Sequence, residues 1–149
     1  MSVKGREVMR IVTLSLLAAV ACAPVPRTGA QTQGLATCHG AQKPRDVAEL
    51  LFGRNVGNRI GVSEAAWARF VAREMTPRFP DGLSVVDATG QWRDRDSGKV
   101  VREPSKRVEI VLPGADDDAA KLDAIAAAYK TRFHQQSVGI VVRPACVSF

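Results

Sequence analysis

The side chains best suited to chemistry lie around predicted turns, one predicted hairpin and the end of a predicted helix. Arginine and lysine can hold a carboxylate or a phosphate, and tryptophan or tyrosine can stack on a flat ring. The candidate binding residues are Arg78, Asp81, Gln91, Trp92, Arg102, Glu103, Lys106, Tyr129, Lys130 and Gln136. Together these residue types predict a pocket for a small anion.

The same residues also have a structural interpretation, which we favour. Arg78 and Glu103 can form a salt bridge that fixes the hairpin. Asp81 lies in Pro80-Asp81-Gly82, where its side chain can stabilise the turn. Turns and hairpins need such residues even where no ligand binds.

Motifs for catalysis, metals and cofactors are missing from the sequence. No serine lies in a nucleophile elbow, and there is no glycine-rich phosphate loop. The histidines are His39, which follows Cys38 in a predicted tether, and His134 at a predicted helix end. Cys38-His39 lacks the second ligand pair of a zinc site, and Asp116–Asp118 lacks the spacing of a calcium loop. We expect neither a cofactor nor a metal ion.

The net charge of +6 does not indicate a nucleic-acid-binding protein. Many basic residues alternate with acids, as in Arg93-Asp94-Arg95-Asp96, and no basic stripe with interleaved aromatic residues is present. The hydrophobic fraction of 46% is ordinary for a globular protein. The length of 149 residues fits one domain preceded by targeting segments.

The first residues have the pattern of an export signal. Lys4, Arg6 and Arg10 precede the apolar run Ile11–Ala21, which is too short for a stable transmembrane helix. We predict a signal peptide over residues 1–21. The domain therefore belongs outside the cytoplasm, in the periplasm or elsewhere in the envelope.

Cys22 follows small residues, as a lipidated cysteine does in a lipoprotein signal. Ala19 stands where leucine is usual in such signals, so ordinary cleavage after Ala30 is the alternative. We favour lipidation of Cys22, which attaches the protein to the membrane through a lipid anchor. Residues 22–45 are rich in Pro, Gln, Thr and Gly and are predicted to form a flexible tether.

Cys38 and Cys146 are an even pair in an oxidising compartment. We therefore predict a disulfide between them, with two unpaired thiols as the alternative. The bond would fasten the segment before the domain to its last strand.

The domain is predicted to span residues 46–149. The predicted strands are 50–55, 83–92, 100–112 and 138–142, the last continuing toward Cys146, with one helix between Ser63 and Pro77 and another from Asp116–Asp118 to Phe133. Pro104 predicts an edge position or a bulge in the third strand.

The element order β-α-β-β-α-β predicts an α+β fold of the ferredoxin-like kind. Right-handed crossovers place both helices on one face of a four-stranded antiparallel sheet. The other face stays open, and such a face often packs against a second copy, so we expect it to be the surface of any homodimer.

Several segments together resemble one bacterial family of secreted proteins and lipoproteins, the domain-of-unknown-function 3574 family. They are Thr76–Leu83, Gly90–Arg93, Arg102–Lys106, Tyr129–Val138 and Cys146–Phe149. The resemblance runs from about residue 38 to the C-terminus. It implies an exported single-domain protein and no particular activity. Gln136 stands where we expect glutamate, which removes one carboxylate.

Two functions follow from these observations. We expect a non-catalytic envelope protein that serves a structural role or binds an unknown envelope protein or a small anion. The alternative is a small dimeric ferredoxin-like enzyme. A buried apolar cavity lined by Arg78, Trp92 and Tyr129 would favour the enzyme, whereas a solid core with these residues in surface salt bridges would favour the binding or structural role.

Export is testable with a fusion of residues 1–45 to a reporter that is active only outside the cytoplasm. We expect an active fusion, because the basic residues and the short apolar run suffice for secretion. A radioactive fatty acid should label the full chain and not the Cys22→Ala variant. An inactive fusion would refute export, and the absence of label on both chains would refute lipidation.

Overall fold

The computed structural model describes residues 37–94 and 97–149. The predicted signal peptide, Cys22 and most of the predicted tether lie outside the described residues. The main elements are β1 (Lys43–Gly53), α1 (Glu64–Phe70), a π-helical stretch η1 (Val71–Met75), β4 (Ser84–Arg93), β5 (Val100–Val111), α2 (Asp118–Phe133) and β6 (Gly139–Val147), with short strands β2 (Asn55–Val56) and β3 (Arg59–Ile60).

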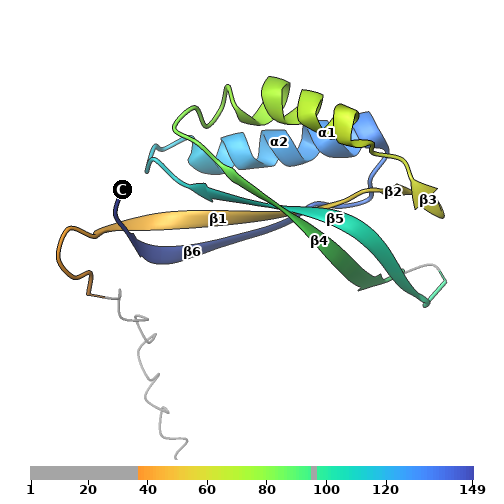
Figure 1. Cartoon of the computed structure of the whole chain (residues 1–149), viewed down its shortest axis with the longest axis horizontal. Helices are drawn as coiled ribbons and strands as arrows, with labels where there is room; N and C mark the ends of the chain where they lie inside the picture. Colours follow the sequence, from red (N-terminus) through yellow and green to blue (C-terminus); the bar gives the residue numbers. More distant parts are fainter. Residues whose placement is uncertain (1–36, 95–96) are drawn as a thin grey trace, which may run out of the picture. The chain divides into compact units, whose positions relative to one another are not determined.

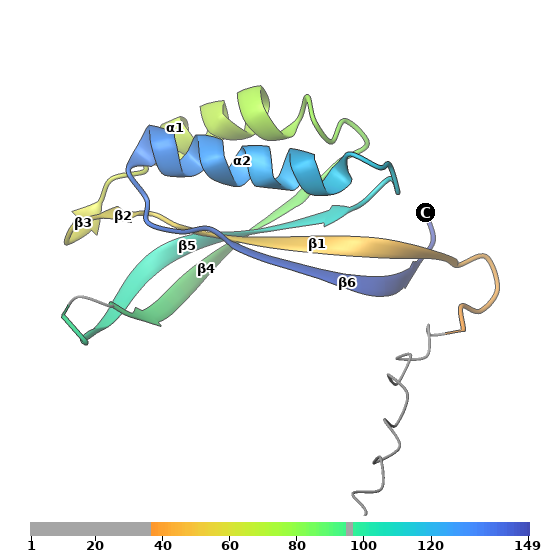
Figure 2. The ribbon, with the colours of Figure 1, turned by 180° about the vertical axis from the view of Figure 1, so that it is seen from behind.

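The large sheet has the strand order β4-β5-β1-β6, and every neighbouring pair is antiparallel. Both helices cover one face of this sheet and leave the other face open (Figure 1, and from behind in Figure 2). This arrangement confirms the predicted ferredoxin-like α+β fold.

β1 is longer than the predicted strand and begins at Lys43 instead of Leu50. Its first residues are polar or proline, so they lack the apolar alternation that indicates a strand. They are strand because β6 pairs with them as far as Lys43 opposite Val147. The strand therefore includes the last residues of the predicted tether.

Pro104 lies in a continuous central strand, so the predicted edge position was wrong. Its carbonyl accepts a bond from the Arg54 N–H, just beyond the end of β1 at Gly53. The N–H that proline lacks points to the same side as its carbonyl. No ladder bond is lost there, because the pairing with β1 has already ended at Gly53 opposite Ser105.

The core lies between the helices and the covered face of the sheet. α2 buries Leu122, Ile125, Ala126, Tyr129 and Phe133, which is the stripe predicted from its 3.6-residue period. The ring of Tyr129 packs edge-on against that of Phe52 from β1, with centroids 4.7 Å apart. The core is therefore a close-packed aromatic cluster.

The first helix begins as predicted, with the hydroxyl of Ser63 accepting from the Ala66 N–H at 3.2 Å. It then widens into η1, where the Thr76 N–H bonds the Val71 carbonyl five residues earlier. Pro77 lies one residue after this bond, where a proline needs no helical N–H partner.

The open face carries charged pairs and exposed apolar side chains. Arg143 lies 3.2 Å from Glu109, and Arg107 lies 3.8 Å from Glu49. The exposed apolar residues on this face include Leu51, Val86, Trp92 and Val141. A homodimer through this face stays a prediction. Within the described ranges, no helix is both long and apolar enough to span a membrane.

Cys38 and Cys146 form a disulfide that closes a separation of 108 residues. The bond joins the segment before β1 to the end of β6, as predicted. Removing it frees a long loop in the unfolded chain, so Cys38→Ser/Cys146→Ser should lower the free energy of unfolding by up to about 4–5 kcal/mol. Urea melts of both proteins measure this difference.

The matching chemical test is a thiol titration of the denatured, unreduced domain spanning residues 33–149. Neither cysteine should react until a reductant is added. Two reactive thiols before reduction would contradict the disulfide.

Candidate functional site

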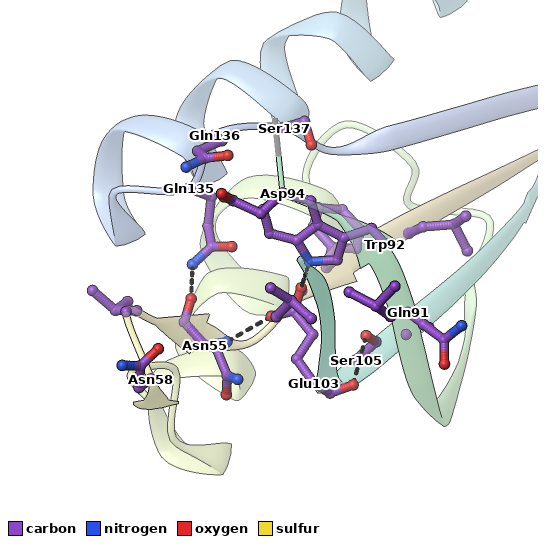
Figure 3. A pocket seen from close by; sticks show the side chains of 18 of the residues that line it. Asn55, Asn58, Gln91, Trp92, Asp94, Glu103, Ser105, Gln135, Gln136 and Ser137 are labelled. Atoms are coloured by element: carbon purple, nitrogen blue, oxygen red, sulfur yellow. Dashed lines mark hydrogen bonds between the residues drawn. The ribbon is translucent and has the colours of Figure 1, made fainter. Parts of the chain in front are cut away.

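A groove of about 740 Å³ opens at the end of the sheet where β1 stops. Its walls are formed by the β1–β2 junction, by the half of the β4–β5 hairpin next to its turn and by the loop between α2 and β6. Its polar side chains include Asn55, Asn58, Gln91, Trp92, Asp94, Glu103, Ser105, Gln135, Gln136 and Ser137 (Figure 3). We call this hollow the groove.

Glu103 is the centre of the groove. Its carboxylate accepts a bond from the Trp92 Nε1–H at 2.8 Å and another from the Asn55 backbone N–H at 3.0 Å. The residue is only 9% exposed. Glu103 therefore ties the β4–β5 hairpin to the segment that follows β1.

Two glycines make room for this arrangement. A β-carbon at Gly53 would lie 2.6 Å from the Glu103 carboxylate, and one at Gly90 would lie 2.6 Å from the Ser105 hydroxyl oxygen. Both glycines lie inside strands, where glycine often marks a close approach. A larger residue at Gly53 would force the carboxylate to move.

The third wall is held by the turn after α2. His134 closes the helix in the left-handed conformation, with φ of 53°. The amide of Gln135 then donates to the Asn55 carbonyl at 2.6 Å. Asn55 is thus held through its N–H by Glu103 and through its carbonyl by Gln135.

The groove unites only part of the predicted binding set. Gln91, Trp92, Glu103 and Gln136 line it. The remaining predicted residues do not line the groove. They are Arg78, Asp81, Arg102, Lys106, Tyr129 and Lys130. Because most of the missing residues are cations, the groove does not fit the predicted anion pocket.

Arg78 does not pair with Glu103, so that prediction was wrong. Its guanidinium bonds the Glu74 carbonyl at 2.7 Å and the Glu74 carboxylate at 3.0 Å. The first helix runs back along the sheet, which leaves Arg78 at the end opposite to the groove. Asp81 also lies at that opposite end, in a hollow that includes Phe149.

Tyr129 is fully buried, so its ring cannot stack on a ligand. Its hydroxyl donates to the Gly53 carbonyl at 2.8 Å, directly beneath the position occupied by Glu103. Burial raises the pKa of Tyr129 well above its ordinary value. The residue supports the groove from inside the core.

Lys106 lies on the covered side of the sheet, in a separate ion network. Its ammonium, 5% exposed, bonds both Asp87 and Glu64. Glu64 also meets Arg54 at 2.5 Å, and the Arg54 guanidinium bonds the Val62 carbonyl. This network fastens the start of α1 to the sheet.

The network shifts the ionisation of its members. Hydrogen bonds to Asp87 and Glu64 raise the pKa of Lys106. The hydrogen bond from Lys106 lowers the pKa of Glu64 and that of Asp87. All three groups are therefore held in their charged forms near neutral pH.

Arg102 and Lys130 are exposed and do not line the groove. In the described parts of the chain, Lys99 is the one lysine or arginine that does line it. Among those residues no group of three or more histidines, cysteines or carboxylates could hold a metal ion. The polar lining of the groove thus combines amides, hydroxyls and one indole with the carboxyl groups of Asp94 and Glu103.

Sequence reasoning missed Asn55, Ser105 and Gln135. Nothing in their local spacing marks them, because they meet only through strand register and the turn after α2. The available signal was the pair of strand glycines, Gly53 and Gly90, which indicates a close approach of other atoms.

Residues 47–149 match the family model described as "Protein of unknown function (DUF3574)". The chain belongs to this family. No curated protein matches the sequence.

Two solved structures are similar to this chain, and the first of them supports the fold. A phage SAM lyase in complex with S-methyl-5'-thioadenosine has 21% identity and a TM-score of 0.57, covering 75% of this chain and 93% of that one. CutA from Synechococcus elongatus has 10% identity and a TM-score of 0.45, covering 72% of this chain and 80% of that one. Identities this low relate folds and leave the activity of the DUF3574 protein open.

The ion network predicts a pH dependence for Lys106→Met. The pKa values of Glu64 and Asp87 are lower when folded, so their stabilising contribution is present above the ordinary values of 4.5 and 3.8 and is lost as the pH falls through the folded ones. The stabilisation of the wild type relative to the variant, measured as the difference in free energy of unfolding, should therefore become smaller on going from pH 7 to pH 3. Urea melts at several pH values measure it, and a difference that is constant over this range would contradict the network.

Proposed function

We propose that this DUF3574 protein is an exported, lipid-anchored envelope protein that binds a small polar molecule in the groove and does not transform it. The observation that carries the proposal is the arrangement around Glu103. A buried carboxylate and an indole ring, 38% exposed, lie in one hollow, surrounded by the amides of Asn55, Gln91 and Gln136. Such sites bind small molecules through a few convergent polar groups beside an apolar surface.

The core is consistent with the binding role. Phe52, Phe70, Tyr129 and Phe133 pack against one another there, and Tyr129 does not line a buried apolar cavity of the kind that would favour the enzyme. Arg78 is in a surface salt bridge with Glu74. The solid core and the salt bridge of Arg78 are the features that support a binding or structural role, whereas Trp92 and Tyr129 form hydrogen bonds instead.

The place of the groove suits a tethered protein. The disulfide and the first residue of β1, Lys43, mark the end of the sheet at which the chain enters. The groove lies at the other end, beyond Gly53, and a strand of 11 residues spans about 35 Å. An anchor at Cys22 would thus attach to the end of the sheet that lies farther from the ligand.

Binding is testable by NMR with the indole N–H of Trp92 as the reporter. A library of small polar metabolites, adenosine and S-methyl-5'-thioadenosine included, is titrated into the labelled domain. We expect at least one compound to shift the Trp92 indole and the Asn55 amide in a saturable way. The indole of Trp67, 5% exposed in the core, serves as the internal control and should stay unchanged.

The matched variants are Trp92→Ala and Val86→Ala, two exposed positions on β4. Trp92→Ala should weaken the binding by about tenfold or more, because the ring contact is lost. Val86 does not line the groove, so Val86→Ala should bind normally. A library without any compound that acts on Trp92, or equal losses in both variants, would overturn the proposal.

An enzyme remains the second candidate, because the similar phage SAM lyase was solved with S-methyl-5'-thioadenosine. The direct test is incubation of the purified domain with S-adenosylmethionine. We expect no S-methyl-5'-thioadenosine above the rate without protein. Product formation that is abolished by Glu103→Gln would make the chain an enzyme.

A further inference from the structure

We propose that the groove selects a ligand with a fixed positive charge, a quaternary ammonium or a sulfonium group, seated on the face of the Trp92 ring beside Glu103. The proposal rests on the proposed function, since it requires the groove to bind a small molecule. It adds the chemical class of the ligand.

The carboxyl group of Glu103 is held by two N–H donors at the edge of the groove. One of its oxygens accepts from the Trp92 Nε1–H and the other from the Asn55 N–H. Acceptance of N–H donors through both oxygens is the bonding pattern of a carboxylate. The residue is also nine-tenths buried.

The partners of Glu103 differ from those of the other buried charged groups in the described ranges. Every salt bridge among the described residues joins other groups, and none includes Glu103. A buried charge without a counter-ion is costly, and a cation brought by a ligand would offset that cost. By contrast, the buried ammonium of Lys106 has two carboxylate partners.

The face of the Trp92 indole is the other part of the proposed site. In the described ranges the cation–π contacts are those of Lys121 with Phe79 and of Arg132 with Phe133, so no described cation covers Trp92. The ring lies at the groove with its Nε1 directed at Glu103 (Figure 3). An aromatic face beside a carboxylate is the arrangement that recognises quaternary ammonium groups.

The charge of the lining agrees with this class of ligand. Among the described lining residues the acids are Asp94 and Glu103, and the one lysine or arginine is Lys99. A fixed cation also needs no hydrogen bond, which suits a carboxylate whose oxygens already accept N–H donors.

The test compares choline with 3,3-dimethylbutan-1-ol, which has the same shape and no charge. Both are titrated into the labelled domain while the Trp92 indole N–H is followed. We expect choline to give a saturable shift with an apparent affinity at least about tenfold above that of the alcohol. Rising sodium chloride should weaken choline binding and leave the alcohol unaffected, because only the cation is screened.

Variants separate the two contacts. Glu103→Gln keeps the size of the side chain and removes its charge, so it should abolish the preference for choline. Glu109→Gln is the control, on the same strand and outside the groove, and should keep the preference. Trp92→Phe should retain part of the choline affinity and Trp92→Leu should lose it, because phenylalanine keeps an aromatic face.

Equal binding of the two compounds by the wild type would overturn the proposal and leave a groove for neutral ligands, so the proposed function would survive. No shift with choline would overturn it as well. The salt dependence is measured on the wild type, so the result stands even where Glu103→Gln fails to fold. Failure of the proposed function would be a different result, namely that no compound of the library shifts the Trp92 indole signal.

Discussion

Gly53 is the point on which the rest of the structure depends. It ends β1, the strand that pairs with both β5 and β6. Its carbonyl accepts the hydroxyl of the buried Tyr129, and the space above its α-carbon holds the carboxylate of Glu103. One residue without a side chain thus connects the aromatic core to the groove. A β-carbon at Gly53 would displace the carboxylate of Glu103 and would therefore break this connection between the core and the groove.

The two sides of the sheet use charge in different ways. On the covered side, the buried cations Arg54 and Lys106 reach outward to carboxylates that are largely solvated, Glu64 and Asp87. Each buried charge there has an opposite partner, which is what the low dielectric of a protein interior requires. On the groove side, Glu103 has N–H partners and no cation. This difference distinguishes a network that holds elements together from a site that can receive a ligand.

The framework around the groove is fixed at both ends. At the far end, the disulfide between Cys38 and Cys146 joins the beginning of β1 to the end of β6. At the groove, hydrogen bonds from Asn55 to Glu103 and from Gln135 to Asn55 join three separate segments. The hydrogen bond from Trp92 to Glu103 holds the indole and the carboxylate together in the absence of a ligand. Preorganisation of this kind lowers the ordering cost of binding.

The sequence by itself determined what depends on local spacing and on compartment. The stripe of α2, the cap at Ser63, the order of elements and the pairing of Cys38 with Cys146 all follow from periodicity, capping chemistry or thiol parity. Each of these signals is contained in a short segment or in a count of residues. The polar start of β1 had no such signal, because that segment is strand only through its pairing with β6.

Only the tertiary structure decided which side chains meet. Glu103 meets Trp92 across the β4–β5 ladder, and it meets Asn55 because the register places Gly53 opposite Ser105. Arg78 lies at the other end of the sheet and bonds Glu74 instead. Neighbours across a sheet are set by register, and a shift of one residue would turn every side chain to the other face. The spacing of residues along the chain does not specify that register, and so the groove could be recognised only in the folded protein.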